Sequence, residues 1–202
     1  MKLKFSSLEI KSDLLPHDKN EIDQFKELSF YIYESMKDAD YIELEIDDNI
    51  INLLSFLTTK LIEGIADNIY ANIFENKGAK YLSGDISLVV SEALTYATLN
   101  SLYKVSLTNI IPFRSVKYLG TIVDAMIDIG KEEELRRILG ARGGFLFINI
   151  RASMTPRSYY IVDKLAKSLM NLEMVRYPND YGLISVIVKD NEAIKENFIF
   201  VK

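Results

Sequence analysis

The size and composition of this chain restrict the classes of protein to which it can belong. Its 202 residues suit one domain, and a hydrophobic fraction of 49% is enough to fill a substantial core. The formal net charge of -5 disfavours a general polyanion binder, and the lack of cysteine excludes disulfide bridges, thiolate metal sites and cysteine nucleophiles.

The first elements along the chain show strand and helix patterns in turn. Apolar and polar residues alternate over 2–11 and again over 41–47. This alternation predicts two strands, of which the second has one polar face and should lie near a sheet edge. Between them, Asn20 can cap a helix whose apolar residues recur at helical spacing from Ile22 to Met36.

The next predicted element is an unusually long helix over 49–76. Apolar residues recur there at three- and four-residue steps, and at about 1.5 Å per residue the helix would be roughly 40 Å long. Tyr70 and Phe74 widen its apolar stripe beyond what one contact face requires. We expect this surface to be buried by the following helix, which begins at Ser83, or by a second copy of the chain in a homodimer.

Four elements are predicted in the next part of the chain. The first is a strand over 106–113. It is followed by a helix with the apolar residues Leu119, Ile122, Met126 and Ile129. A short helix then begins near Glu132 and ends at Gly140. The apolar run over 145–150 predicts a central strand that is covered on both faces.

The last part of the chain begins with a clear signal for a helix. Thr155 can serve as its N-cap, and Pro156 suits the first helical position. Three short strands are predicted after this helix, over 174–177, 183–189 and 198–201, with turn residues before the second. They should form an antiparallel meander.

The order of these elements predicts an α/β fold. We expect a mixed sheet with helices on both faces, one unusually long helix and a C-terminal antiparallel meander. No linker rich in Pro, Gly or Ser divides the chain, so a single domain over 1–202 is predicted. Charged residues interrupt the long apolar stretches, and residues 1–5 lack the apolar core of a secretory signal. We therefore expect a cytoplasmic protein that does not enter a membrane.

The candidate ligand site joins the end of a predicted strand to the start of a helix. Open α/β sheets commonly bind ligands at such turns, where free backbone amides, arginines and hydroxyls suit a phosphate or carboxylate. A second strand end carries a similar Arg-Ser pair. The predicted ligand-binding residues are Arg114, Ser115, Arg151, Ser153, Thr155, Arg157 and Ser158. They predict a small phosphorylated or otherwise anionic, nucleotide-like ligand. The alternative is purely structural: a helix cap, with arginines that are solvated or paired with carboxylates.

Other motifs give weaker signals. Glu43, Glu45 and Asp47 fall on an exposed strand face, so no metal site is predicted. His17 is the only histidine, which excludes two-histidine metal motifs within one chain. The glycine-rich segment 140–144 lacks the lysine and hydroxyl residues of a phosphate-binding loop. No reaction and no cofactor is assigned on this basis.

A small basic patch is the basis for a third hypothesis. Arg136, Arg137 and Arg142 could contact nucleic acid, since phosphate contacts are mainly electrostatic. Aromatic residues do not alternate regularly with these arginines, and the chain as a whole is acidic. Nucleic-acid binding is therefore less favoured than a small anionic ligand or a homodimer.

Overall fold

The computed structural model describes most of the chain. The described residues are 1–16, 22–61, 79–113, 122–153, 157–189 and 193–202, and within the helices the side chains of 57–61 and 79–88 are not described.

A seven-stranded mixed sheet forms the centre of the fold, with the order β2-β1-β7-β6-β5-β4-β3. The strands are β1 (Lys2–Ile10), β2 (Ile42–Glu45), β3 (Ile110–Pro112), β4 (Ala125–Asp128), β5 (Phe145–Ser153), β6 (Tyr181–Lys189) and β7 (Ile194–Val201). The pairs β1–β7 and β5–β6 are parallel, and the other four are antiparallel. The prediction of an α/β fold with a mixed sheet is confirmed, and β2 lies at an edge as expected.

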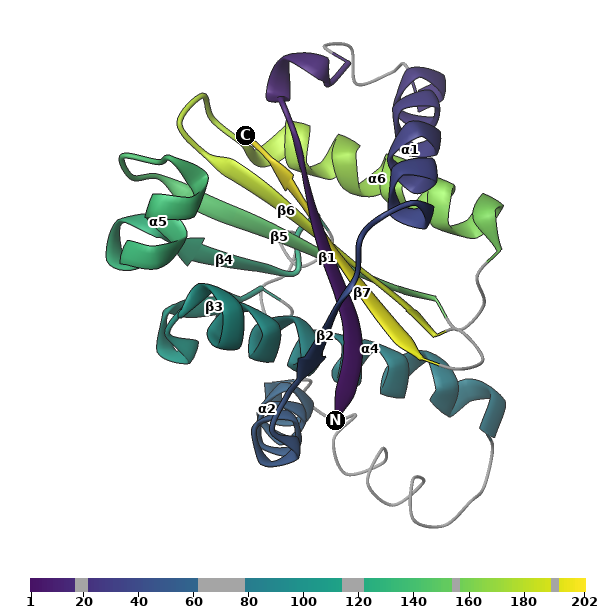
Figure 1. The fold of residues 1–202 in the computed structure, drawn as a ribbon, viewed down its shortest axis with the longest axis vertical. Coiled ribbons are helices and arrows are strands. Elements are labelled where there is room, and N and C mark those ends of the chain that lie inside the picture. The colour runs from purple at the N-terminus through teal and green to yellow at the C-terminus, as the bar shows by residue number, and fades with distance from the viewer. Residues whose placement is uncertain (17–21, 62–78, 114–121, 154–156, 190–192) are drawn as a thin grey trace.

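The longer helices lie in two pairs (Figure 1). Helix α1 (Ile22–Lys37) packs with α6 (Ser158–Val175) on one side of the sheet. Helix α2 (Asp48–Leu61) packs with α4 (Ala79–Tyr103) on the other side. The short helix α5 (Glu133–Leu139) connects β4 to β5 and ends at Gly140, whose φ of 64° is left-handed, as the sequence predicts.

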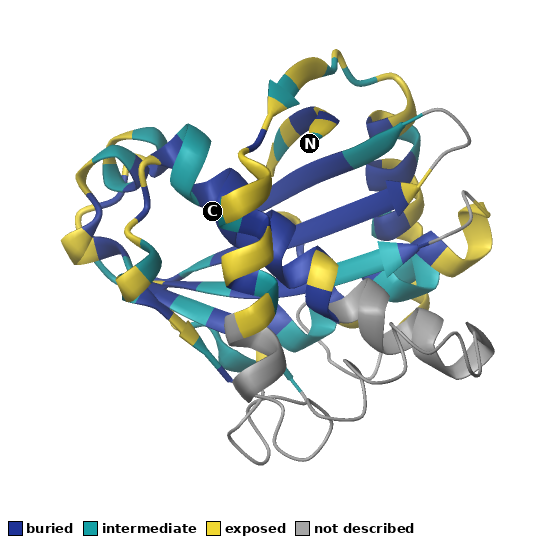
Figure 2. Ribbon diagram, turned by 90° about the horizontal axis from the view of Figure 1, so that it is seen from below, coloured by how far each residue is buried: buried dark blue, intermediate teal, exposed yellow. Residues whose placement is uncertain are grey.

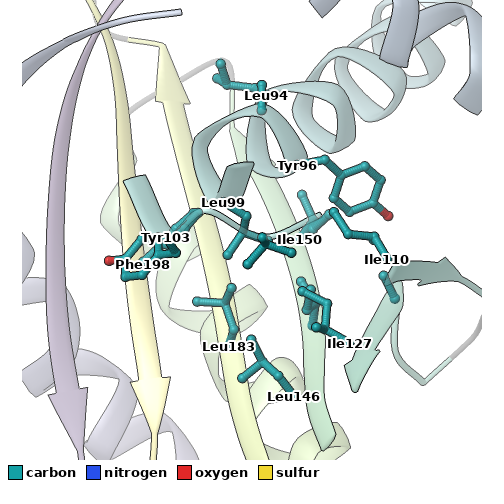
Figure 3. Close-up of a cluster of buried hydrophobic side chains, with 14 of the residues drawn as sticks. Leu94, Tyr96, Leu99, Tyr103, Ile110, Ile127, Leu146, Ile150, Leu183 and Phe198 are labelled. Atoms are coloured by element: carbon teal, nitrogen blue, oxygen red, sulfur yellow. The ribbon is translucent and has the colours of Figure 1, made fainter. Parts of the chain in front are cut away.

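Two hydrophobic clusters occupy the two sides of the sheet because successive side chains of a strand point to opposite faces. On β5, Leu146 and Ile148 belong to the cluster under α4, whereas Phe147 packs against the cluster under α1 and α6. Figure 3 shows Leu99 of α4 close to Leu183 of β6 in the first cluster. The central strands are buried along most of their length (Figure 2), which explains why the run over 145–150 is almost wholly apolar.

The predicted helix around Met126 is wrong. Residues Ala125–Asp128 form strand β4, which pairs antiparallel with β3 and β5. Ala125 and Ile127 are fully buried while Met126 and Asp128 are partly exposed, a period of two residues. In so short a segment, apolar residues spaced three or four apart also fit a strand, and pairing with β5 decides between the two structures.

The predicted strand over 174–177 is also wrong. Helix α6 continues to Val175, and the backbone N–H of Arg176 still bonds to the carbonyl of Leu172. The chain therefore ends in a two-stranded antiparallel hairpin, β6–β7, in place of a three-stranded meander. Strand β7 then pairs with β1, so the hairpin lies inside the sheet.

Three helix and strand boundaries also differ from the predictions. Helix α4 begins at Ala79, so the predicted start at Ser83 falls inside it, and α6 begins at Ser158, two residues after the expected first position. Strand β3 is limited to Ile110–Pro112, preceded by a short 3-10 turn. The predicted helix over 49–76 is described only as far as Leu61, and its remainder lies outside the described residues.

None of the helices in the described part of the chain is both long and apolar enough to cross a membrane.

Candidate functional site

The predicted ligand residues that the structure describes lie on both sides of one strand-to-helix connection. Arg151 and Ser153 are at the carboxyl end of β5, and Arg157 and Ser158 are at the start of α6. Arg114, Ser115 and Thr155 lie outside the described residues. The contribution of the second Arg-Ser pair, Arg114 and Ser115, to the site therefore stays a prediction.

Arg151 is held by a network of hydrogen bonds. Its Nη1 donates to Asp124 Oδ2 at 2.9 Å and to the carbonyl of Ile150 at 2.7 Å, and its Nη2 donates to Asn149 Oδ1 at 2.6 Å. Asp124 Oδ2 also accepts the backbone N–H of Ile150 at 2.6 Å. The two charged side chains are only 23% and 10% exposed. The guanidinium is therefore fixed at one position beside β5, as a preorganised site requires.

Asn149 has a polar atom that this network does not satisfy. An arginine can only donate hydrogen bonds, so the Asn149 oxygen must face Arg151 and the Nδ2 group must point elsewhere. Asn149 is fully buried, and its Nδ2 has no hydrogen-bond partner within the described part of the chain. A buried donor without an acceptor costs about 1–3 kcal/mol, so an acceptor from a bound molecule would stabilise this position.

Lys164 brings a second positive charge to the same place. From the second turn of α6 its Nζ reaches β5 and donates to the carbonyl of Ala152, the residue next to Arg151. Burial and the nearby charge of Arg151 lower the pKa of the Lys164 amine. No carboxylate among the described residues is within ion-pairing distance of this amine, and the neighbouring Asp163 pairs with Lys167 instead.

Lys164, Asp124 and Asn149 are not among the residues predicted from the sequence to form the site. A signal for Lys164 exists, because it follows the buried Ile161 by three residues and therefore lies near the sheet-facing side of α6. Asn149 also had a local signal, because it precedes Arg151 by two residues on β5 and therefore shares its face of the strand. Asp124 gave no such signal, since it lies before β4 and meets Arg151 only because β4 pairs with β5.

The start of α6 adds an exposed surface next to these charges. Arg157 precedes the helix and is exposed, and its side chain makes no capping hydrogen bond. Tyr159 and Tyr160 are 75% and 52% exposed, and their rings meet edge to face at 5.9 Å between centroids. A planar group of a ligand could stack on such a ring.

The metal-site and nucleic-acid hypotheses receive no support from the described residues. Within the described residues, no group of three acidic or histidine side chains could hold a metal ion. Arg137 of the predicted basic patch pairs with Glu134, which offsets its charge.

A second polar cluster, which the sequence analysis also missed, lies between α4 and the sheet. Glu196 on β7 is fully buried and accepts hydrogen bonds from Thr98 at 2.6 Å, Ser185 at 3.0 Å and Thr95 at 3.1 Å. Burial raises the pKa of Glu196 to about 7, although the three hydroxyl hydrogen bonds act in the opposite direction.

Comparison of the chain with protein-family models, with curated proteins and with solved structures found no match.

Proposed function

We propose that this protein binds a small anionic ligand at the carboxyl end of β5, with Lys164 and Arg151 as the cationic groups. The main support is the placement of two half-buried cations side by side, with Asp124 as the one carboxylate that pairs with them among the described residues. Two like charges destabilise each other, and an anionic group between them would remove that repulsion.

A phosphate or carboxylate suits this site best. The guanidinium of Arg151 is fixed in orientation, the Lys164 amine lies near it at the carbonyl of Ala152, and Asn149 Nδ2 is a neutral donor without a partner among the described residues. Ser153, Arg157 and Ser158 frame the same connection, and Arg114, Ser115 and Thr155 remain predicted members of the site. The exposed Tyr159 and Tyr160 support a nucleotide-like ligand, whose base could stack on a ring.

Calorimetric titration with inorganic phosphate, a nucleoside monophosphate and a dicarboxylate tests this proposal. We expect at least one of these anions to bind, and Lys164→Met to weaken binding at least about tenfold, since a hydrogen bond to a charged group contributes about 1.5–3 kcal/mol. Lys167→Met is the matched control because Lys167 lies on the same helix, is exposed and pairs with Asp163. Absence of binding by all three anions, or equal binding by the Lys164→Met variant, would overturn the proposal.

A homodimer through α2 is a second candidate, and it is compatible with the first. Leu53 and Phe56 on α2 are 55% and 43% exposed, which supports a contact on this side of the molecule. We expect sedimentation to give the mass of a dimer at micromolar concentration, and Leu53→Asp to shift it to a monomer. Tyr31→Asp, on the other side of the sheet, should leave the dimer intact. A wild-type monomer at all concentrations would contradict this candidate.

A single domain and a cytoplasmic location are two further proposals. The pairing of β1 with β7 joins the two ends of the chain in one sheet and supports a single domain over 1–202. The lack of cysteine supports a reducing compartment such as the cytoplasm.

A further inference from the structure

The Lys164 amine points toward the sheet, which is unusual for a lysine on a helix at the protein surface. Most lysines extend their charged group into water. Lys164 instead turns toward the sheet and hydrogen-bonds the carbonyl of Ala152, an acceptor without a full charge. The carbonyl of Ala152 accepts only one of the hydrogen-bond donors that the amine carries.

The groups around this amine lower its pKa. Arg151 lies on the neighbouring position of β5, and its charge and the burial of Lys164 both disfavour a second positive charge. Asp124, the carboxylate of this network, is already bonded to Arg151 and to the backbone of Ile150. A lysine that is desolvated beside another cation is the arrangement that makes an amine nucleophilic at neutral pH.

We propose that Lys164 forms an imine with the carbonyl group of an anionic aldehyde or ketone, such as an oxo acid or a phosphorylated carbonyl compound. This inference depends on the proposed function, since Arg151 would hold the anionic group of the ligand while the amine meets its carbonyl carbon. It assigns a covalent step to a site that otherwise only binds.

The step balances without an oxidant or a reductant. The lone pair of Lys164 Nζ forms a bond to the carbonyl carbon, and the electrons of the C=O double bond move to the oxygen, which takes a proton. The nitrogen loses a proton, and the resulting carbinolamine then expels water. The products are the imine and one molecule of water.

Reductive trapping tests the inference on the full chain. The protein is incubated with glyoxylate, a small anionic aldehyde, and cyanoborohydride, and peptide mapping by mass spectrometry locates the carboxymethyl groups that result. We expect the adduct mainly on Lys164, with much less on the exposed Lys167 of the same helix, and we expect inorganic phosphate to reduce labelling of Lys164 only. Labelling spread evenly over the lysines would overturn the inference.

Calorimetric titration of the wild-type protein with inorganic phosphate separates this inference from the proposed function, because it measures anion binding without any covalent step. If wild-type protein binds phosphate through Lys164 but shows no adduct there, the imine is excluded and anion binding stands. If the adduct forms but phosphate neither binds nor competes, the anionic ligand class is excluded.

Discussion

The free energy of unfolding should fall by about 3 kcal/mol more in the wild type than in Glu196→Gln as the pH rises from about 4 to about 8. The buried carboxyl of Glu196 causes this difference, because burial raises its pKa from the ordinary 4.5 to about 7. Each unit of such a shift corresponds to about 1.4 kcal/mol. The three hydroxyls around Glu196 can rotate to accept as well as donate, so glutamine fits the same position.

The direction follows from proton linkage. Below pH 4.5 the carboxyl is protonated in both the folded and the unfolded chain, and its full contribution to stability is present. Between that value and about 7 the unfolded chain releases the proton while the folded chain keeps it, so rising pH favours unfolding. Above about 7 both states are ionised and the loss is complete.

Urea denaturation at a series of pH values measures this effect for the wild type and Glu196→Gln. Comparing the two curves removes the contributions of all other titrating groups. Glu27→Gln is the control, since it removes an exposed carboxylate of α1 and should keep the wild-type profile. A difference between wild type and Glu196→Gln that stays constant with pH would contradict the prediction.

Asp124→Ala should lower the free energy of unfolding by roughly 3–5 kcal/mol, the range found when one partner of a buried ion pair is removed. Asp124 is the carboxylate partner of Arg151 and also accepts the backbone N–H of Ile150. Its removal leaves a largely buried guanidinium and a buried N–H without this acceptor. Asp124→Asn should cost less, because the amide oxygen can still accept from Ile150.

Chemical denaturation of Asp124→Ala, Arg151→Met and the double variant forms a cycle that isolates the pair. We expect the double variant to be more stable than Asp124→Ala, because it no longer buries an unpaired charge. A loss below about 1 kcal/mol for Asp124→Ala would be the value of an exposed ion pair and would show that Arg151 is not held as described.

Where local patterns were strong, sequence reasoning predicted the fold well. Helix α1 has its apolar residues at regular helical spacing, α5 ends at a glycine with positive φ, and β5 is a run of apolar residues. Each of these signals reports a local property, such as a buried face or a backbone angle. The prediction failed for short segments such as β4, because four residues are too few to distinguish a helical period from a strand period.

The candidate site was predicted only in part for a related reason. Arg151 and Ser153 were found because they follow a buried strand and precede a helix, which is a local arrangement. The residues that determine the chemistry of Arg151 come from other segments: Asp124 precedes β4, and Lys164 follows on α6. Their distance from Arg151 depends on strand pairing and helix packing, so no local pattern reports it.

The sequence by itself determined the class of this protein: an α/β chain without cysteine, with an edge strand at β2, a buried central strand at β5 and an arginine where that strand ends. The tertiary structure alone decided which charges meet there. The sequence gives the type of each side chain but not its surroundings. The pKa of Lys164 is lowered and that of Glu196 is raised by burial and, for Lys164, by the charge of Arg151. These surroundings exist only once the sheet and the helices are assembled.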